Sequence, residues 1–96
     1  NVYEEILPGS IDPDQIIFSN TQPALIGAVA PTGGDGIYTY QWQSSTDNVT
    51  FTDIVGFTNL TYQPGILTTT TYYRLVQSNA YCSVDVTTPV HTVTVL

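Results

Sequence analysis

The chain has 96 residues, 42% of them hydrophobic and 11% aromatic, and its eight acidic residues against one basic residue give a net charge of −7. This length fits one domain, residues 1–96, and the apolar content excludes a disordered segment. Nucleic acid and anionic membranes are disfavoured as partners because both attract clustered lysine and arginine. No apolar run approaches the ~20 residues of a membrane span, so membrane insertion is not expected.

Taken in chain order, the predicted elements are all β-strands. Short runs of β-branched and aromatic residues alternate with turn-forming clusters such as Asp12-Pro13-Asp14, and no stretch has a helical period of useful length. This spacing predicts an antiparallel β-sandwich of seven or eight strands, of the immunoglobulin or fibronectin type III kind. The predicted strands cover residues 2–7, 15–18, 24–30, 38–43, 49–54, 60–62, 71–77 and 90–95.

The strand over 38–43 is expected to organise the core. Tyr38, Tyr40 and Trp42 fall on one face of a pleated strand, with polar residues between them on the other face. Trp42 is the only tryptophan of the chain. We therefore expect Trp42 at the centre of the core, rather than on a surface that binds sugar rings.

The strand over 71–77 carries a second pattern. Tyr73 follows Leu67 by six residues, which is the spacing of the tyrosine corner found in immunoglobulin-type sandwiches. Tyr73 and Leu75 are then expected to face the core. The alternate residues are expected to point away from it: Tyr72, Arg74 and Val76.

Three acidic residues in or beside predicted loops are candidate calcium ligands: Asp12, Asp14 and Asp35. No complete calcium-loop motif follows them, so a solvated acidic surface is the favoured interpretation, and no cofactor is otherwise expected. His91 lies in the closing strand without a neighbouring histidine or cysteine, which favours a structural role over metal binding. No G-x-S-x-G turn occurs and Cys82 has almost no basic residues to activate it, so we expect no enzymatic activity.

Several motifs together carry a resemblance to a known family. The chain resembles the immunoglobulin-like repeats of very large secreted adhesins of gliding Bacteroidetes, which the type IX system exports. The residues that carry it are Pro8-Gly9-Ser10-Ile11, Asp14-Gln15-Ile16-Ile17, Gly33-Gly34, Tyr38-Thr39-Tyr40-Gln41-Trp42-Gln43-Ser44-Ser45-Thr46-Asp47, Phe51-Thr52-Asp53-Ile54, Tyr62-Gln63-Pro64-Gly65, Leu67-Thr68, Thr71-Tyr72-Tyr73-Arg74 and Cys82.

The resemblance implies a non-catalytic repeat in a tandem array that forms a stalk or filament on the cell surface, in adhesion and gliding motility. Its expected partners are adjacent repeats of the same polypeptide and surface polysaccharide, and the isolated domain is expected to be a secreted monomer. The alternative is a module that binds glycan or calcium through loops at one end of the sandwich.

The resemblance also carries an expectation about the single cysteine. Members of the family often have a cysteine at the position of Phe18, which would pair with the cysteine that matches Cys82. Because Phe18 stands there in this chain, Cys82 is expected to be a free thiol.

Overall fold

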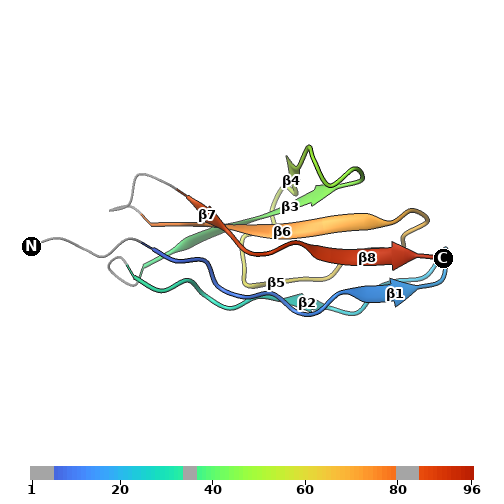
Figure 1. Ribbon diagram of the computed structural model, residues 1–96, viewed down its shortest axis with the longest axis horizontal. Coiled ribbons are helices and arrows are strands. Elements are labelled where there is room, and N and C mark those ends of the chain that lie inside the picture. Colours follow the sequence, from blue (N-terminus) through green and yellow to red (C-terminus); the bar gives the residue numbers. More distant parts are fainter. Residues whose placement is uncertain (1–5, 34–36, 80–84) are drawn as a thin grey trace, which may run out of the picture.

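The computed structural model describes residues 6–33, 37–79 and 85–96 (Figure 1). These residues contain eight strands and no helix, so the all-β prediction is confirmed for the described chain. The predicted opening strand, residues 2–7, lies mostly outside the described residues. Only its last two residues are described, and the second of them, Leu7, forms an antiparallel bridge with Thr32. The strands are β1 (Gln15–Ile17), β2 (Ile26–Gly27), β3 (Thr39–Ser45), β4 (Thr52–Asp53), β5 (Thr61–Tyr62), β6 (Thr71–Ser78), β7 (Val86–Thr87) and β8 (His91–Val95).

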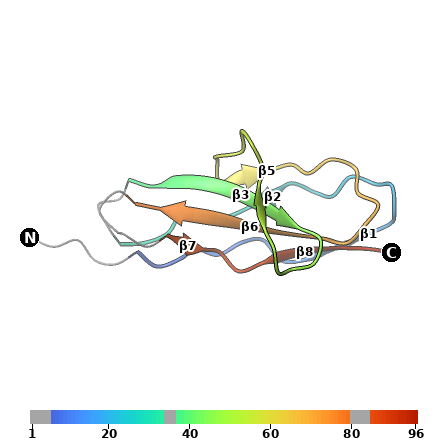
Figure 2. The ribbon, with the colours of Figure 1, turned by 90° about the horizontal axis from the view of Figure 1, so that it is seen from above.

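The strands form two sheets along an elongated molecule. The large sheet has the order β1-β8-β6-β3-β4, with β7 also paired to β6, and the small sheet pairs β2 with β5. The long strands β3, β6 and β8 run along the long axis in both views (Figures 1 and 2). The core cluster takes Ile26 from the small sheet and four residues from the large one, so the two sheets face each other across it.

One pair departs from the predicted antiparallel arrangement, because β1 and β8 run parallel. The chain before β1 belongs to the other layer, where Leu7 pairs with Thr32 and Ile11 pairs with Ala28. At Asp12-Pro13-Asp14 it crosses to the edge of the large sheet without reversing its direction. Proline suits this crossing because it lacks the N–H that a regular ladder would require.

Trp42 occupies the centre of the core, as its strand pattern predicts. Its side chain is fully buried, and the indole Nε1–H donates a 2.8 Å hydrogen bond to the Asn59 carbonyl. The ring of Tyr62 lies with its centroid 5.9 Å away, and the half-buried Tyr40 packs against the same cluster. The buried ring thus joins β3 to the segment that leads into β5.

The register predicted for β6 is confirmed. Residues at alternate positions are buried, and Tyr72, Arg74 and Val76 between them are half-buried on the other face. Burial raises the pKa of Tyr73 to about 12; Tyr62 adds to the increase and a hydrogen bond with Thr71 opposes it. The Tyr73 phenol therefore stays neutral inside the core.

Gln77, at the end of the same buried face, joins the two layers. Its side chain is fully buried, its Oε1 accepts from Gly9 N–H at 2.9 Å, and its Nε2 donates to the Val29 carbonyl at 2.8 Å. Both ends of the amide are therefore satisfied, which a buried polar group requires. The backbone at Gly9 lies so close to the backbone at Val29 that a Cβ atom on residue 9 would stand 1.8 Å from Val29 O.

We expect Gly9→Ala to destabilise the domain by about 1–3 kcal/mol, because backbone must move to admit the methyl group. Gly65→Ala is the matched control: nothing lies within 4 Å of its Cβ position. That change should be neutral or stabilise by about 0.5 kcal/mol through the unfolded chain. Urea denaturation followed by Trp42 fluorescence measures both, and equal effects of the two substitutions would contradict the close approach at Gly9.

The hairpin that joins β3 to β4 is organised by Asp47. The predicted turn over 44–48 begins later, because β3 continues through Ser45. One carboxylate oxygen of Asp47 accepts from the Ser45 hydroxyl and from the backbone N–H groups of Val49 and Thr50 at 2.8–2.9 Å. The bonds from Thr50, Val49 and Ser45, in that order, lower the pKa of Asp47 to about 2 from 3.8.

We expect Asp47→Ala to lower stability at neutral pH and to lose that effect in acid. The folded pKa is depressed, so the carboxylate contributes stability above the unfolded value of 3.8, and this contribution is lost as the pH falls to about 2. Chemical denaturation of both proteins across that range measures the difference. A difference that is the same at pH 2 as at neutral pH would contradict the assignment to the charged form.

Candidate functional site

The first candidate site is the junction of the first and last strands of the described chain. We call it the β1–β8 seam and define it as residues 12–17 and 91–96. Backbone pairing continues beyond the strands, because Leu96 N–H donates to the Ile17 carbonyl at 2.9 Å. The paired residues are Gln15 with Val93, Ile16 with Thr94 and Ile17 with Val95.

His91 lies at the other end of the seam, opposite the bond between Leu96 and Ile17. The side chain is fully buried, with Nδ1 2.8 Å from the Asp12 carbonyl and Nε2 3.2 Å from the Gln15 amide nitrogen. A carbonyl can only accept, so Nδ1 carries the proton and Nε2 accepts from Gln15. The Gln15 amide is held in this orientation by two bonds to the backbone of Ala24. His91 thus has a structural role, with both ring nitrogens in use.

The candidate calcium ligands Asp12 and Asp14 are directed at two different strands. Asp12 Oδ2 accepts from Gly27 N–H of β2 at 2.8 Å, and Asp14 Oδ1 accepts from Thr92 N–H of β8 at 2.9 Å. The third candidate, Asp35, lies outside the described residues. Among the residues that the structure describes, no group of three or more His, Cys, Asp and Glu is placed to hold a metal ion. Calcium binding therefore stays a prediction, and the two visible carboxylates are hydrogen-bond acceptors in the fold.

The expectation for the single cysteine stays a prediction, because Cys82 lies outside the described residues. Phe18, the position at which the resemblance implies a partner cysteine, directly follows β1. Because β1 is parallel to β8 and β6 is antiparallel to β8, the ends of β1 and β6 lie at opposite ends of the large sheet.

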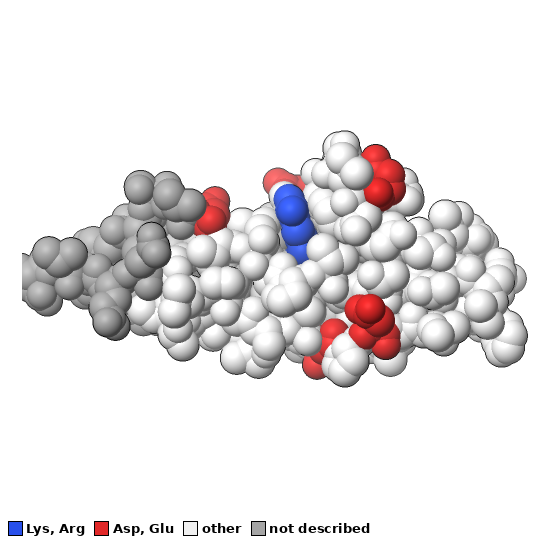
Figure 3. All heavy atoms as spheres, in the orientation of Figure 1, with Lys and Arg blue, Asp and Glu red and all other residues white. Residues whose placement is uncertain are grey.

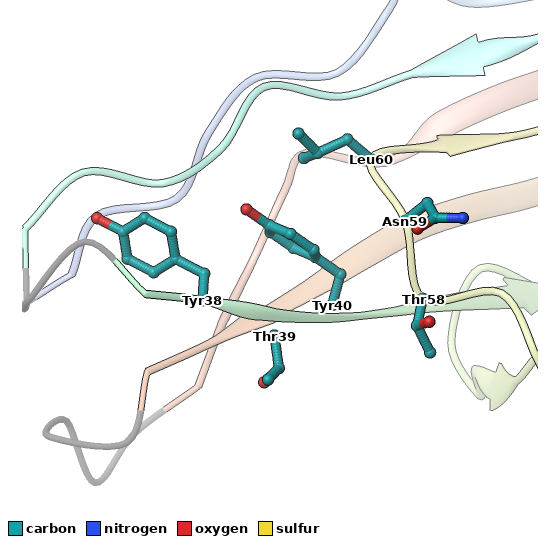
Figure 4. Close-up of a pocket in the computed structure, with 6 residues that line it drawn as sticks. All are labelled: Tyr38, Thr39, Tyr40, Thr58, Asn59 and Leu60. Atoms are coloured by element: carbon teal, nitrogen blue, oxygen red, sulfur yellow. The ribbon is translucent and has the colours of Figure 1, made fainter.

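The second candidate site is an open cleft of about 510 Å³ beside β3. Figure 4 shows Tyr38 and Tyr40 pointing side by side in one direction, while Thr39 points the opposite way. The Tyr38 hydroxyl donates to the Gly33 carbonyl at 2.5 Å. A sugar-binding surface built on Trp42 is excluded because that ring is buried, as the sequence predicts. The cleft is lined by Tyr38, Thr39, Tyr40, Thr58, Asn59 and Leu60.

Arg74, the only basic residue, lies on the outer face of the large sheet, where Figure 3 shows it as a single blue patch. Its guanidinium carbon lies 4.2 Å from the centre of the Phe51 ring, and its Nε donates to Gln43 Oε1 at 2.7 Å. Gln43 in turn donates to Asp53 at 2.9 Å. Arg74 therefore connects β6 with β3 and the hairpin beyond it, on the face that the predicted register directs away from the core.

These features define an all-β domain of two facing sheets, in which the terminal strands of the described chain are paired. The family model named "Domain of unknown function (DUF8696)" matches residues 7–96, and the chain belongs to this family. No curated protein and no solved structure matches the chain. Within the described ranges, no helix of a length and hydropathy suited to a membrane crossing is present.

The sequence singles out individual residues of the seam, but it does not show which distant strands their side chains bind. Asp12, Asp14 and His91 stand out in the sequence as possible metal ligands. Their partners are 15 to 79 residues away along the chain and are mostly backbone groups. Backbone groups carry no sequence signal, so pattern alone could not show that these side chains join strands.

Proposed function

We propose that this domain is an immunoglobulin-like β-sandwich that serves as a non-catalytic structural repeat of a long, secreted cell-surface adhesin. Its role is to carry tension from one neighbouring repeat to the next, within a stalk or filament that acts in surface adhesion and gliding motility. The arrangement of the β1–β8 seam is the observation that carries this proposal.

The immunoglobulin-like assignment rests on two buried aromatic residues. Immunoglobulin domains have a buried tryptophan on a central strand and a tyrosine near the start of a later strand. In this chain Trp42 on β3 and Tyr73 on β6 are both buried, and β3 and β6 pair directly, which supports the assignment. The core between two facing sheets supports the same assignment.

The path of the chain suits a domain that is pulled from both ends. The described chain enters at one end of the long axis, and the C terminus lies at the other end (Figures 1 and 2). The molecule measures 52 × 21 × 20 Å along its principal axes. Tension applied through the two ends is therefore directed along the strands of the large sheet.

Such tension acts on the seam in shear. Because β1 and β8 are parallel and adjacent, pulling β1 backward and β8 forward slides one along the other. All hydrogen bonds across the seam are then stretched together, whereas a hairpin pulled open from one end loses its bonds one at a time. The bonds from Thr92 to Asp14 and from Leu96 to Ile17 extend this loaded set beyond the strands.

The surface is consistent with a module that acts by length and number of copies. In Figure 3 the end that carries the C terminus shows neither acidic nor basic atoms, and the acidic residues lie scattered over the rest of this face. Repeat arrays of this kind depend on contacts between neighbours and on multivalency rather than on one reactive site.

Single-molecule pulling through the two ends tests the proposal. We expect Asp14→Ala to raise the unfolding rate at a given force by about tenfold, because it removes one charge-assisted bond of about 1.5 kcal/mol from the seam. Asp53→Ala is the matched control, since this exposed carboxylate bonds to Gln43 away from the seam. If both substitutions raise the unfolding rate by the same factor, the seam does not carry the applied force and the proposal is contradicted.

A further inference from the structure

The N-terminal half of β3 forms a free edge of the large sheet. In the order β1-β8-β6-β3-β4, the last strand β4 pairs only with Gln43 and Ser44 of β3. The preceding residues of β3, from Thr39 to Gln41, pair with β6 on one side. No strand of the described chain pairs with them on the other side.

The backbone groups of Tyr40 point toward this free side. Trp42 N–H donates to the Phe57 carbonyl at 3.1 Å, and the Trp42 carbonyl accepts from Ile54 N–H at 2.9 Å. Both groups of Trp42 are therefore directed away from β6. In an antiparallel pair this direction repeats every second residue, so the N–H and C=O of Tyr40 have the same direction. Within the described chain, no backbone hydrogen bond outside the strand ladders uses either group.

The 510 Å³ cleft lies along this free edge. One wall is β3 from Tyr38 to Tyr40, and the other is the segment from Thr58 to Leu60, which crosses from the large sheet to the small one (Figure 4). That segment is held in place by the bonds from Trp42 Nε1 to Asn59 and from Ala28 N–H to Leu60. The cleft is thus a groove with a fixed far wall and a hydrogen-bonding strand edge on its near side.

We propose that this groove binds a short extended peptide strand, which adds to the large sheet beside Tyr40. This inference goes beyond the structural role proposed above and does not depend on it. An extended peptide is the ligand that supplies both a donor and an acceptor in the plane of the sheet, at the spacing of a strand.

The two faces of the groove determine the pattern of side chains in the peptide. Tyr40 and Leu60 pack against the core cluster and offer apolar surface on the inner face. Thr39 and Thr58 point together toward the opposite side (Figure 4). A bound strand therefore alternates apolar and polar residues. The lining is uncharged and the chain has a net charge of −7, so the peptide is neutral or basic.

The probe for the test is the peptide acetyl-Lys-Thr-Val-Thr-Val-Thr-Lys-amide, added to the isotope-labelled 96-residue chain. We expect the amide resonance of Tyr40 to shift and its hydrogen exchange to slow by about tenfold. N-methylation of alternate residues gives two control peptides. Because only every second N–H of a bound strand faces β3, one of them should lose binding and the other should retain it.

Two matched variants of the protein locate the site. Thr58→Trp fills the groove from its exposed wall and is expected to weaken binding by about tenfold or more. Thr68→Trp places the same ring on an exposed residue remote from the groove and should leave binding unchanged. Both positions are exposed, so both variants are expected to fold, and Trp42 burial can be checked by fluorescence.

Three results would overturn the proposal. The first is a Tyr40 amide as protected from exchange in the free chain as that of Gln41, since the edge would then be occupied. The second is equal binding, or no binding, by the two N-methylated peptides and the parent. The third is a shift of the Tyr40 amide resonance on addition of a neutral oligosaccharide such as chitotriose but not on addition of the peptide. That result would make the cleft a glycan-binding site.

Discussion

Trp42→Ala is expected to remove a large part of the stability of this domain, at a cost of about 4 kcal/mol. The indole is fully buried between the two sheets, where it contacts the Tyr62 ring and donates to the Asn59 carbonyl. Truncation leaves a cavity that the surrounding strands cannot close without breaking their ladders. A small domain has a total stability of about 5–15 kcal/mol, so this loss should lower the melting temperature by many degrees.

Trp42→Phe separates the contribution of the ring from that of its N–H group. Phenylalanine fills most of the space but cannot donate to Asn59, and we expect about half of the loss. Thermal unfolding followed by the circular dichroism of the tyrosines measures both variants, because neither retains a tryptophan. A Trp42→Ala protein with unchanged melting temperature would show that the core is not centred on this residue.

His91→Ala is expected to cost about 3 kcal/mol, a large effect for a residue outside the main apolar cluster. The imidazole is fully buried, and its loss leaves the Asp12 carbonyl and the Gln15 amide without this partner. The substitution also weakens the seam at the point where the chain crosses between layers. Both the equilibrium stability and the resistance to pulling should fall together.

Thr92→Ala is the control for His91→Ala. Thr92 is the next residue of β8, and its seam contact is a backbone bond to Asp14 that alanine preserves. We expect a change within about 0.5 kcal/mol, measured by urea denaturation with Trp42 fluorescence. A His91→Ala protein as stable as this control would contradict the structural role assigned to the imidazole.

The acidic residues show how the interpretation of a motif depends on its neighbours in space. Asp12 and Asp14 have the alternate spacing that suits an oxygen-rich cation site, and sequence reasoning names them for that reason. In the structure the Asp12 carboxylate accepts a hydrogen bond from β2, and the Asp14 carboxylate accepts one from β8. Proline between them directs the two side chains to different layers, so the same residues join the sheets.

By itself the sequence determined the all-β class, the long strands β3, β6 and β8 with their buried faces, and the centre of the core, whereas β7 (Val86–Thr87) was not predicted and the strands expected over 24–30 and 49–54 shrink to β2 and β4. Strand formation and alternation are local properties, which is why the burial of Trp42, Tyr73 and Leu75 could be predicted without any knowledge of pairing. Only the tertiary structure decided that β1 lies parallel to β8, that Gln77 and His91 bridge layers, and that half of β3 is an open edge. These features depend on backbone groups from distant segments, and no side-chain pattern specifies where those groups meet.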